Sequence, residues 1–167
     1  WLHFLTMFSF FYIIPHSKHL HLVFAPFNIY WRSFRPTGRL ATVDLDRETA
    51  CGVDVVDDFT WKQLFDAFSC VMCGRCHGAC PSERSLERLK PKKINGRLRT
   101  YLEAEGRQLF RYRSLKGDMA GGGCQGKKEQ LKIVGGLFHD DFIWSCTTCG
   151  SCNQVCPISI DHLGQII

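Results

Sequence analysis

Hydrophobic and polar positions divide the chain into two unlike parts. The first 14 residues, WLHFLTMFSFFYII, contain one histidine and no charged side chain. Such a segment, apolar on all sides, is typical of a helix that is buried in protein or in a membrane. Beyond residue 57, apolar positions recur three or four residues apart, as on one face of a helix that Asp57 or Asp58 could cap. These positions are Trp61, Leu64, Phe65 and Phe68.

A second amphipathic helix is predicted to begin at Pro91. Its apolar face would contain Ile94, Leu98, Tyr101 and Leu102, and Gly106 could end it. Strands would be few, limited to Leu40–Val43 and Cys51–Val56. The pattern therefore predicts a mainly α fold.

Eight of the ten cysteines form two copies of one spacing, C-x2-C-x2-C-x3-C-P. This spacing is typical of a ferredoxin with two [4Fe–4S] clusters, in which the fourth cysteine of each run ligates the other cluster. The first predicted ligand set is Cys70, Cys73, Cys76 and Cys156. The second predicted set is Cys146, Cys149, Cys152 and Cys80.

Other interpretations of the cysteines are weaker. Each run could keep its own fourth cysteine. Zinc sites use two C-x2-4-C pairs and four ligands in total, so a zinc-binding module is a remote alternative. Disulfides do not suit so many closely spaced thiols in a chain without a secretory signal. Cys51 and Cys124 lie outside both runs and are expected to ligate nothing.

Charge and composition limit the classes of function expected for this chain. The net charge is +5, and the basic middle of the chain contains no nucleic-acid-binding motif, so we expect no nucleic acid partner. A basic face that docks an acidic redox partner, or one that is simply solvated, fits better. Since no Ser-His-Asp set, phosphate loop or carboxylate pair is present, we expect single-electron transfer and no substrate-converting site.

The apolar N-terminal segment is predicted to be the end of a transmembrane helix. It is shorter than the about 20 residues that span a bilayer, but the chain begins within an apolar run and without Met, as a piece of a longer protein would. Tyr30 and Trp31 beside Arg32 and Arg35 are typical of the positive, cytoplasmic membrane boundary. The alternative is a buried helix of a soluble protein.

Histidines in an apolar membrane helix are functional candidates. His3 and His21 are 18 residues apart. In one continuous helix this is about 27 Å and five turns, close to the roughly 30 Å hydrocarbon core, with both imidazoles on the same side. Such a helix could offer one axial ligand to each of two stacked haems, and His19 is a second choice for His21.

The segment from His3 through Pro15-His16-Ser17-Lys18-His19-Leu20-His21 to Pro26 resembles the last membrane helix of the γ subunit of respiratory nitrate reductase, a dihaem cytochrome b. The resemblance implies that His3 and His21 bind the two b haems. The helix with the opposite ligands is not part of this chain.

A second resemblance covers the cysteine-rich part. Residues 58–64 (DFTWKQL), the first cysteine run and residues 144–149 (WSCTTC) are similar to membrane-bound Fe–S oxidoreductases related to heterodisulfide reductase. These proteins fuse a cytochrome b domain to a two-cluster ferredoxin, and a Cys-Cys-Gly region follows that does not occur here. The 66-position separation of Cys80 and Cys146 resembles the α-helical ferredoxin of succinate dehydrogenase.

Together these features predict three parts: a cytochrome b-like membrane end at 1–35, a linker at 36–56 and an α-helical two-cluster ferredoxin domain at 57–167. The function would be electron transfer between haem b and the quinone pool in the cell membrane and a redox partner on the cytoplasmic side. That partner would be electron-transfer flavoprotein or a disulfide-handling Cys-Cys-Gly region. The alternative is the haem-free iron–sulfur subunit of a soluble or peripheral dehydrogenase.

Overall fold

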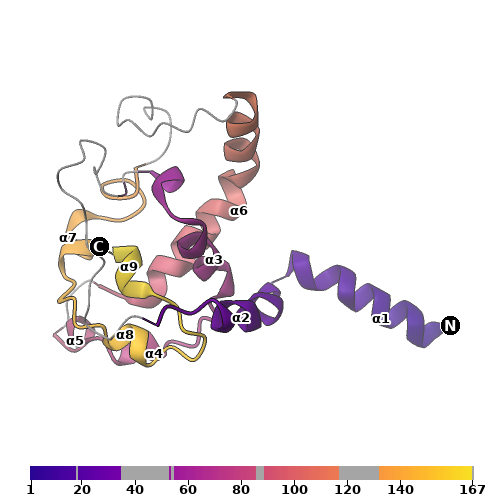
Figure 1. Cartoon of the computed structure of the whole chain (residues 1–167), viewed down its shortest axis with the longest axis horizontal. Helices are drawn as coiled ribbons and strands as arrows, with labels where there is room; N and C mark the ends of the chain where they lie inside the picture. The colour runs from indigo at the N-terminus through magenta and orange to yellow at the C-terminus, as the bar shows by residue number, and fades with distance from the viewer. Residues whose placement is uncertain (18, 35–52, 54, 86–88, 117–131, 167) are drawn as a thin grey trace.

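The computed structural model describes residues 1–17, 19–34, 53, 55–85, 89–116 and 132–166 (Figure 1). This part of the chain is mainly helical, as predicted, and contains no strand. One isolated bridge joins Val134 and Phe138. The predicted strand at Leu40–Val43 lies outside the described residues, as does nearly all of the predicted linker.

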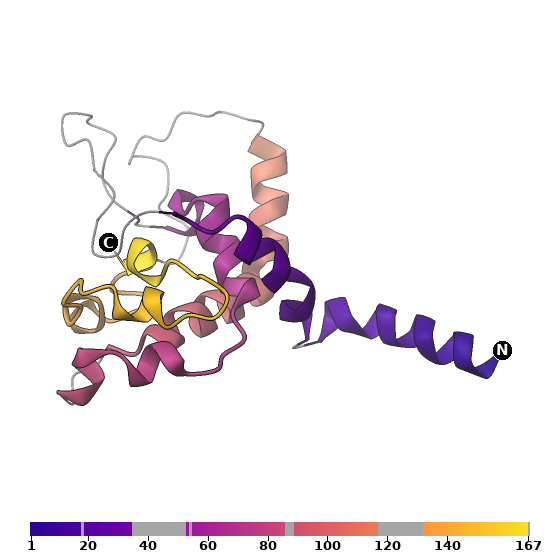
Figure 2. The same cartoon turned by 60° about the horizontal axis from the view of Figure 1, so that its bottom comes forward.

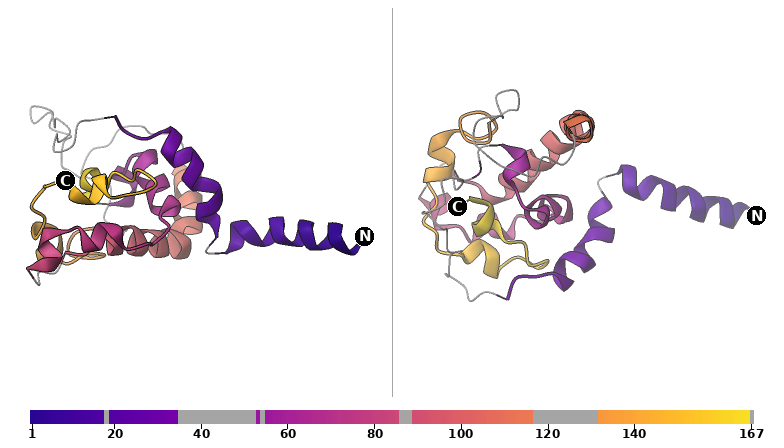
Figure 3. Two further views of the ribbon diagram at one scale, coloured as in Figure 1. Left: turned by 90° about the horizontal axis from the view of Figure 1, so that it is seen from below. Right: turned by 45° about the horizontal axis from the view of Figure 1, so that its top comes forward.

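The N-terminal segment is broken into separate helices. Helix α1 (Leu2–Ile13) is exposed along its whole length and projects away from the rest of the molecule, whereas α2 (Leu20–Tyr30) lies against it (Figures 1 and 3). Between them a 3₁₀ turn, η1 (Ile14–His16), leads to Ser17 in extended conformation. The prediction of one continuous helix from His3 to His21 is therefore wrong, because Pro15 has no N–H group and its ring obstructs the preceding turn.

Among the described residues, no helix has both the length and the apolar character needed to cross a bilayer.

Helix α3 (Trp61–Ser69) begins one residue after its cap, Thr60. The Gln63 N–H donates to the Thr60 hydroxyl, and the Thr60 N–H donates to the Gln63 side chain, which is a reciprocal capping box. The prediction that Asp57 or Asp58 caps this helix is wrong. Asp58 instead accepts a hydrogen bond from the Val55 N–H and closes the preceding 3₁₀ turn, η2 (Val56–Asp58).

Helix α6 (Pro91–Lys116) is the longest described element and crosses the middle of the domain (Figure 2). It begins at Pro91 as predicted but continues past Gly106, so the predicted end at that residue is wrong. One glycine costs a helix about 1 kcal/mol. The flanking Glu, Arg, Gln and Leu residues favour helix enough to offset this cost.

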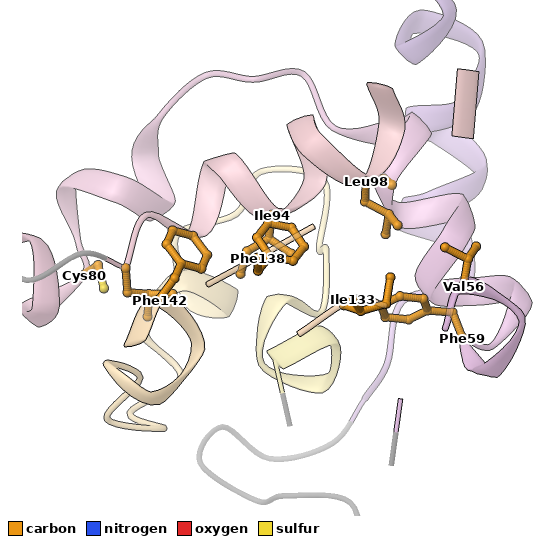
Figure 4. Packing of buried hydrophobic residues seen from close by; sticks show 10 residues of the cluster. Val56, Phe59, Cys80, Ile94, Leu98, Ile133, Phe138 and Phe142 are labelled. Carbon is orange, nitrogen blue, oxygen red and sulfur yellow. The ribbon is translucent and has the colours of Figure 1, made fainter. Parts of the chain in front are cut away.

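The hydrophobic core forms where α6 meets segments from both cysteine runs (Figure 4). Ile94 and Leu98 of α6 are buried at 2% and 0% exposure. Helix α7 (Asp140–Trp144) contributes Phe142, which stacks on Phe138 with ring centroids 5.4 Å apart. Cys80 belongs to the same buried cluster, so the core reaches one predicted ligand directly.

Four short helices complete the described part. Helices α4 (Arg75–Gly78) and α5 (Pro81–Arg84) follow the first cysteine loop, and α8 (Ser151–Gln154) and α9 (His162–Ile166) follow the second. Helix α4 is in contact with α8, so the two cysteine runs lie side by side (Figure 2).

Buried polar side chains fasten α9 to α6 and α3. Asn95 contacts the His162 ring at 3.2 Å, and the Gln165 amide donates to Asn95 and to the Gln63 carbonyl, each at 3.0 Å. His162 is 1% exposed, and its burial lowers the pKa of the imidazole to about 4 from an ordinary 6.5. The folded protein therefore holds this ring neutral.

This burial predicts an acid-dependent loss of stability. Below pH 6.5, the pKa of the imidazole in the unfolded state, the folded protein binds fewer protons than the unfolded chain. The stability that the neutral imidazole contributes is therefore complete above pH 6.5 and is lost as the pH falls toward 4. Between pH 7 and pH 5 the free energy of unfolding of the cluster-loaded wild type should fall by about 2 kcal/mol more than that of the His162→Asn variant. At one scan rate, the drop in thermal midpoint should be about 4–8 °C larger in wild type. An equal drop in both proteins would contradict the neutral, buried imidazole.

Candidate iron–sulfur sites

The two cysteine loops have the same unusual backbone. Met72 and Thr148, at equivalent positions, have positive φ angles of 55° and 53°, and Gly74 and Gly150 follow with 84° and 72°. Left-handed residues at both positions curl each loop tightly, and the second position suits glycine because it has no Cβ. Each loop then enters a short helix, α4 or α8. The repeated cysteine spacing therefore corresponds to a repeated local structure.

The first predicted set of cysteines lines one pocket. Cys70, Cys73 and Cys76 come from the first run, and Cys156 reaches the same pocket from the second. Val71, Pro157 and Ile158 are among the apolar residues of its walls. The pocket thus receives the fourth cysteine of the opposite run.

The cysteines of the second predicted set also lie near one another. Burial raises the pKa of Cys146, and the charges of Cys80 and Cys149 raise it further, against a hydrogen bond from the Thr148 N–H. Cys80 therefore lies near the second run. The Ser82 hydroxyl, two residues after Cys80, donates to the Ser145 carbonyl at 3.0 Å and ties the two segments together.

Burial keeps several thiols protonated in the absence of iron. It raises the pKa of Cys76 to about 11 and that of Cys152 to about 12. Since iron and other metals bind the thiolate, loading the sites must release these protons. Backbone N–H groups already point at sulfur, from Thr148 to Cys146 and from Ile160 to Cys156, each at 3.4 Å. Such hydrogen bonds stabilise the negative sulfur atoms of an iron–sulfur cluster.

The residues present fit [4Fe–4S] clusters. In the described part of the chain, no three His, Cys, Asp or Glu side chains are close enough together to hold one metal ion. Four cysteines around a pocket with apolar walls and two cationic side chains, and with N–H groups aimed at sulfur, match the surroundings of a [4Fe–4S] cluster. Bound there, a cluster supplies one-electron redox chemistry.

Helix α2 packs directly on the first cysteine site. Ala25 contacts the buried cluster of Cys70, Ile158 and Ile160, and Phe24 lies 4.9 Å from Phe65 of α3 between ring centroids. Asn28 is the buried residue of α2, at 0% exposure. Helix α2 is thus joined to the first site by direct contact.

A buried polar cluster holds this junction. The Asn28 amide donates to the Ile158 carbonyl at 2.9 Å, and Lys62 donates to Asn28 at 2.8 Å and to Asp66 at 2.6 Å. Asp66 also accepts a hydrogen bond from the Asp161 N–H at 3.5 Å. These contacts fix the loop between Cys156 and Asp161. None of these three side chains was predicted to have this role, although the four-residue spacing of Lys62 and Asp66 is typical of a helical ion pair.

The predicted haem ligands lie on two separate helices. His3 lies exposed on α1, and His21 is partly buried in the first turn of α2. His19, the second choice, has its ring 6.3 Å from that of His21.

Pairs of substitutions should reveal which cysteines share a cluster. If the runs exchange their fourth cysteines, Cys70→Ala with Cys156→Ala removes ligands from one cluster, and the iron content falls by about half. Cys70→Ala with Cys80→Ala then damages both clusters, and nearly all iron is lost. Iron and acid-labile sulfide are measured in each variant, with Cys124→Ala as the control that retains both. The reverse order of the two double variants would show that each run keeps its own fourth cysteine.

The family model described as 4Fe-4S dicluster domain matches residues 66–160 of the chain. A probable iron-sulfur-binding oxidoreductase of Bacillus subtilis is 32% identical over 187 aligned positions, covering 100% of this chain and 26% of the relative. The EtfAB:quinone oxidoreductase of Syntrophomonas wolfei is 27% identical over 175 positions, covering 100% and 24%. A probable membrane-anchored ferredoxin of Chromohalobacter salexigens is 32% identical over 136 positions, covering 80% and 20%.

The chain thus spans about a quarter, or less, of the length of these relatives. No solved structure matches it significantly. The family match covers more than half of the chain and contains all eight cysteines of the two runs. The chain therefore belongs to the 4Fe-4S dicluster domain family.

Proposed function

We propose that this chain is the junction of a membrane electron-transfer relay. Residues 57–167 form an α-helical ferredoxin domain whose exchanged cysteine sets hold two [4Fe–4S] clusters. Residues 1–35 are the end of a cytochrome b-like membrane domain, connected by residues 36–56, and His3 and His21 each supply one axial ligand to a haem b. The relay connects the quinone pool with a redox partner on the cytoplasmic side of the cell membrane.

The contact of α2 with the first cysteine site carries this proposal. His21 lies in the first turn of α2, and one turn later Ala25 lies against the buried group around Cys70. Asn28, one turn further, donates to Ile158 in the loop that follows Cys156. A haem held near the start of α2 would therefore lie beside the first cluster, and the second cluster would lie farther along the same path.

The N-terminal helices also have the surface of a membrane segment. Phe4, Phe8 and Phe11 of α1 are 62%, 72% and 63% exposed, and no side of the helix is buried. Exposed apolar surface of this kind is typical of a membrane or protein interface. The relative described as a membrane-anchored ferredoxin supports the membrane, and the one described as EtfAB:quinone oxidoreductase supports quinone and electron-transfer flavoprotein as partners.

Within the chain, each part has a distinct role in single-electron transfer. Val71, Ile158 and Ile160 keep water from the first site, and N–H groups stabilise the sulfur atoms.

The haem ligands follow from the resemblance to the nitrate reductase γ subunit alone. Because of the break at Pro15, His3 and His21 belong to separate helices. Their 18-residue spacing therefore no longer places both imidazoles on one side of a single helix.

A redox difference spectrum of membranes that contain the full-length protein tests the haem part. Wild type should show a b-type haem signal when reduced with dithionite, and the double variant His3→Ala, His21→Ala should lose it. His16→Ala is the matched control, since this histidine lies in the turn between the helices and has no assigned role. Iron–sulfur absorbance without any haem signal in wild type would refute the relay and favour a haem-free peripheral subunit.

Substitution of Asn28 tests the junction separately. Asn28→Ala leaves the Ile158 carbonyl and one Lys62 hydrogen bond without a partner, a loss of about 1–3 kcal/mol at the contact. The rate of electron transfer between haem and clusters, followed by stopped-flow spectroscopy, should fall while the haem spectrum stays the same. The control Ile29→Ala alters a neighbouring residue of α2 that is 43% exposed and should leave the rate unchanged. An unaltered rate in Asn28→Ala would show that α2 is not the route.

A further inference from the structure

The two cysteine sites are closely matched in burial. Each contains two buried cysteines, one that is half-buried and one that is exposed. In the first site these are Cys70 and Cys76, then Cys156, then Cys73. In the second they are Cys80 and Cys152, then Cys146, then Cys149. Solvent exposure of the ligands therefore gives no reason for the two clusters to have different reduction potentials.

Hydrogen bonds to sulfur are present at both sites. Equivalent N–H groups, of Met72 and Thr148, act on the first cysteine of each run. The first site adds the Ile160 N–H, 3.4 Å from the Cys156 sulfur. The second adds the hydroxyl and N–H groups of Ser151 and the side chain of Thr147, which lower the pKa of Cys149. These hydrogen bonds favour negative charge on Cys149, so a higher potential at the first site must come from the charged groups around it.

Charged side chains distinguish the two sites. Arg75 and Lys92 both line the pocket of the first site. At the position equivalent to Arg75, the second run has the neutral Ser151. Burial raises the pKa of Cys70, while the Met72 N–H and the charge of Lys92 oppose the rise. In the second site, the main Coulombic effects on Cys146 and Cys152 come from other cysteines within the described part of the chain.

The position of Lys92 is not explained by the stability of its helix. It lies in the first turn of α6, which contains no acidic residue. Cations are unfavourable in the first turn, because the N-terminus of a helix already has a positive partial charge. Lys92 and this helix end therefore act with the same sign on the first pocket.

Reduction adds one negative charge to a cluster and its four thiolates, so a nearby cation stabilises the reduced form. We infer that Arg75 and Lys92 hold the reduction potential of the first site above that of the second. Electrons then enter at the second site and pass to the first, beside α2. In each transfer the second site is oxidised by one electron and the first is reduced by one, and no bond or proton changes. The direction toward the membrane rests on the proposed function, whereas the order of the potentials does not.

A redox titration of the full-length protein, monitored by electron paramagnetic resonance, tests this order. The wild type should show two one-electron steps. Lys92→Met should lower the higher step and leave the lower one in place. The equilibrium constant for transfer from the second site to the first should fall about tenfold, which is ~59 mV for a one-electron couple. The matched controls are Lys92→Arg, which keeps the charge, and Lys93→Met, which alters the exposed neighbour. Both should leave the two steps unchanged.

The equivalent positions of the two loops allow a reciprocal test. Arg75→Ser should lower the higher step, and Ser151→Arg should raise the lower one. If Lys92→Met fails to retain iron, this pair decides the question. Movement of the lower step in Lys92→Met or Arg75→Ser, or no movement in either, would overturn the inference. A wild type without haem would leave these cluster titrations intact, so failure of the proposed relay is distinguishable.

Discussion

The meeting of two loops far apart in the sequence is the constraint on which the rest of the structure depends. Cys156 completes the pocket of a run that begins at Cys70, and Cys80 lies with the run that begins at Cys146. Such loops must be held face to face, and short helices cannot bury enough apolar surface to do so alone. The long helix α6, with Leu98 and Ile94 in the core, and the buried contacts of Asn95, His162 and Gln165 supply the support.

The same backbone with unequal side chains gives a physical basis for direction. Met72 and Thr148, and then Gly74 and Gly150, adopt matching left-handed conformations, so both loops present their cysteines alike. Arg75 and Lys92 line the first pocket, and α2 covers the first site through Ala25. The two cysteine loops therefore have the same local structure in two different environments. In the proposed relay, the site in contact with α2 is also the site with the added positive charge.

The sequence predicted the chemistry of the site better than the details of its scaffold. Cysteine spacing and the periodicity after Pro91 are local signals, and they led to the mainly helical fold and to the four cysteines of the first pocket. The cap of α3 was misassigned because Asp58, Thr60 and Gln63 all suit a helix start, and only the tertiary position of η2 decides among them. The packing of Asn28 against Ile158 joins residues 130 positions apart, and no local pattern contains it.

The most direct measurement of the central claim is the electron paramagnetic resonance spectrum of the fully reduced protein. The cysteines of the two sites are near enough that the charge of Cys76 affects Cys152. Two reduced [4Fe–4S] clusters at this separation should couple magnetically, and the account predicts a complex spectrum that integrates to two spins per chain. A simple signal of one spin per chain, or colourless protein that contains zinc and no iron, would contradict it.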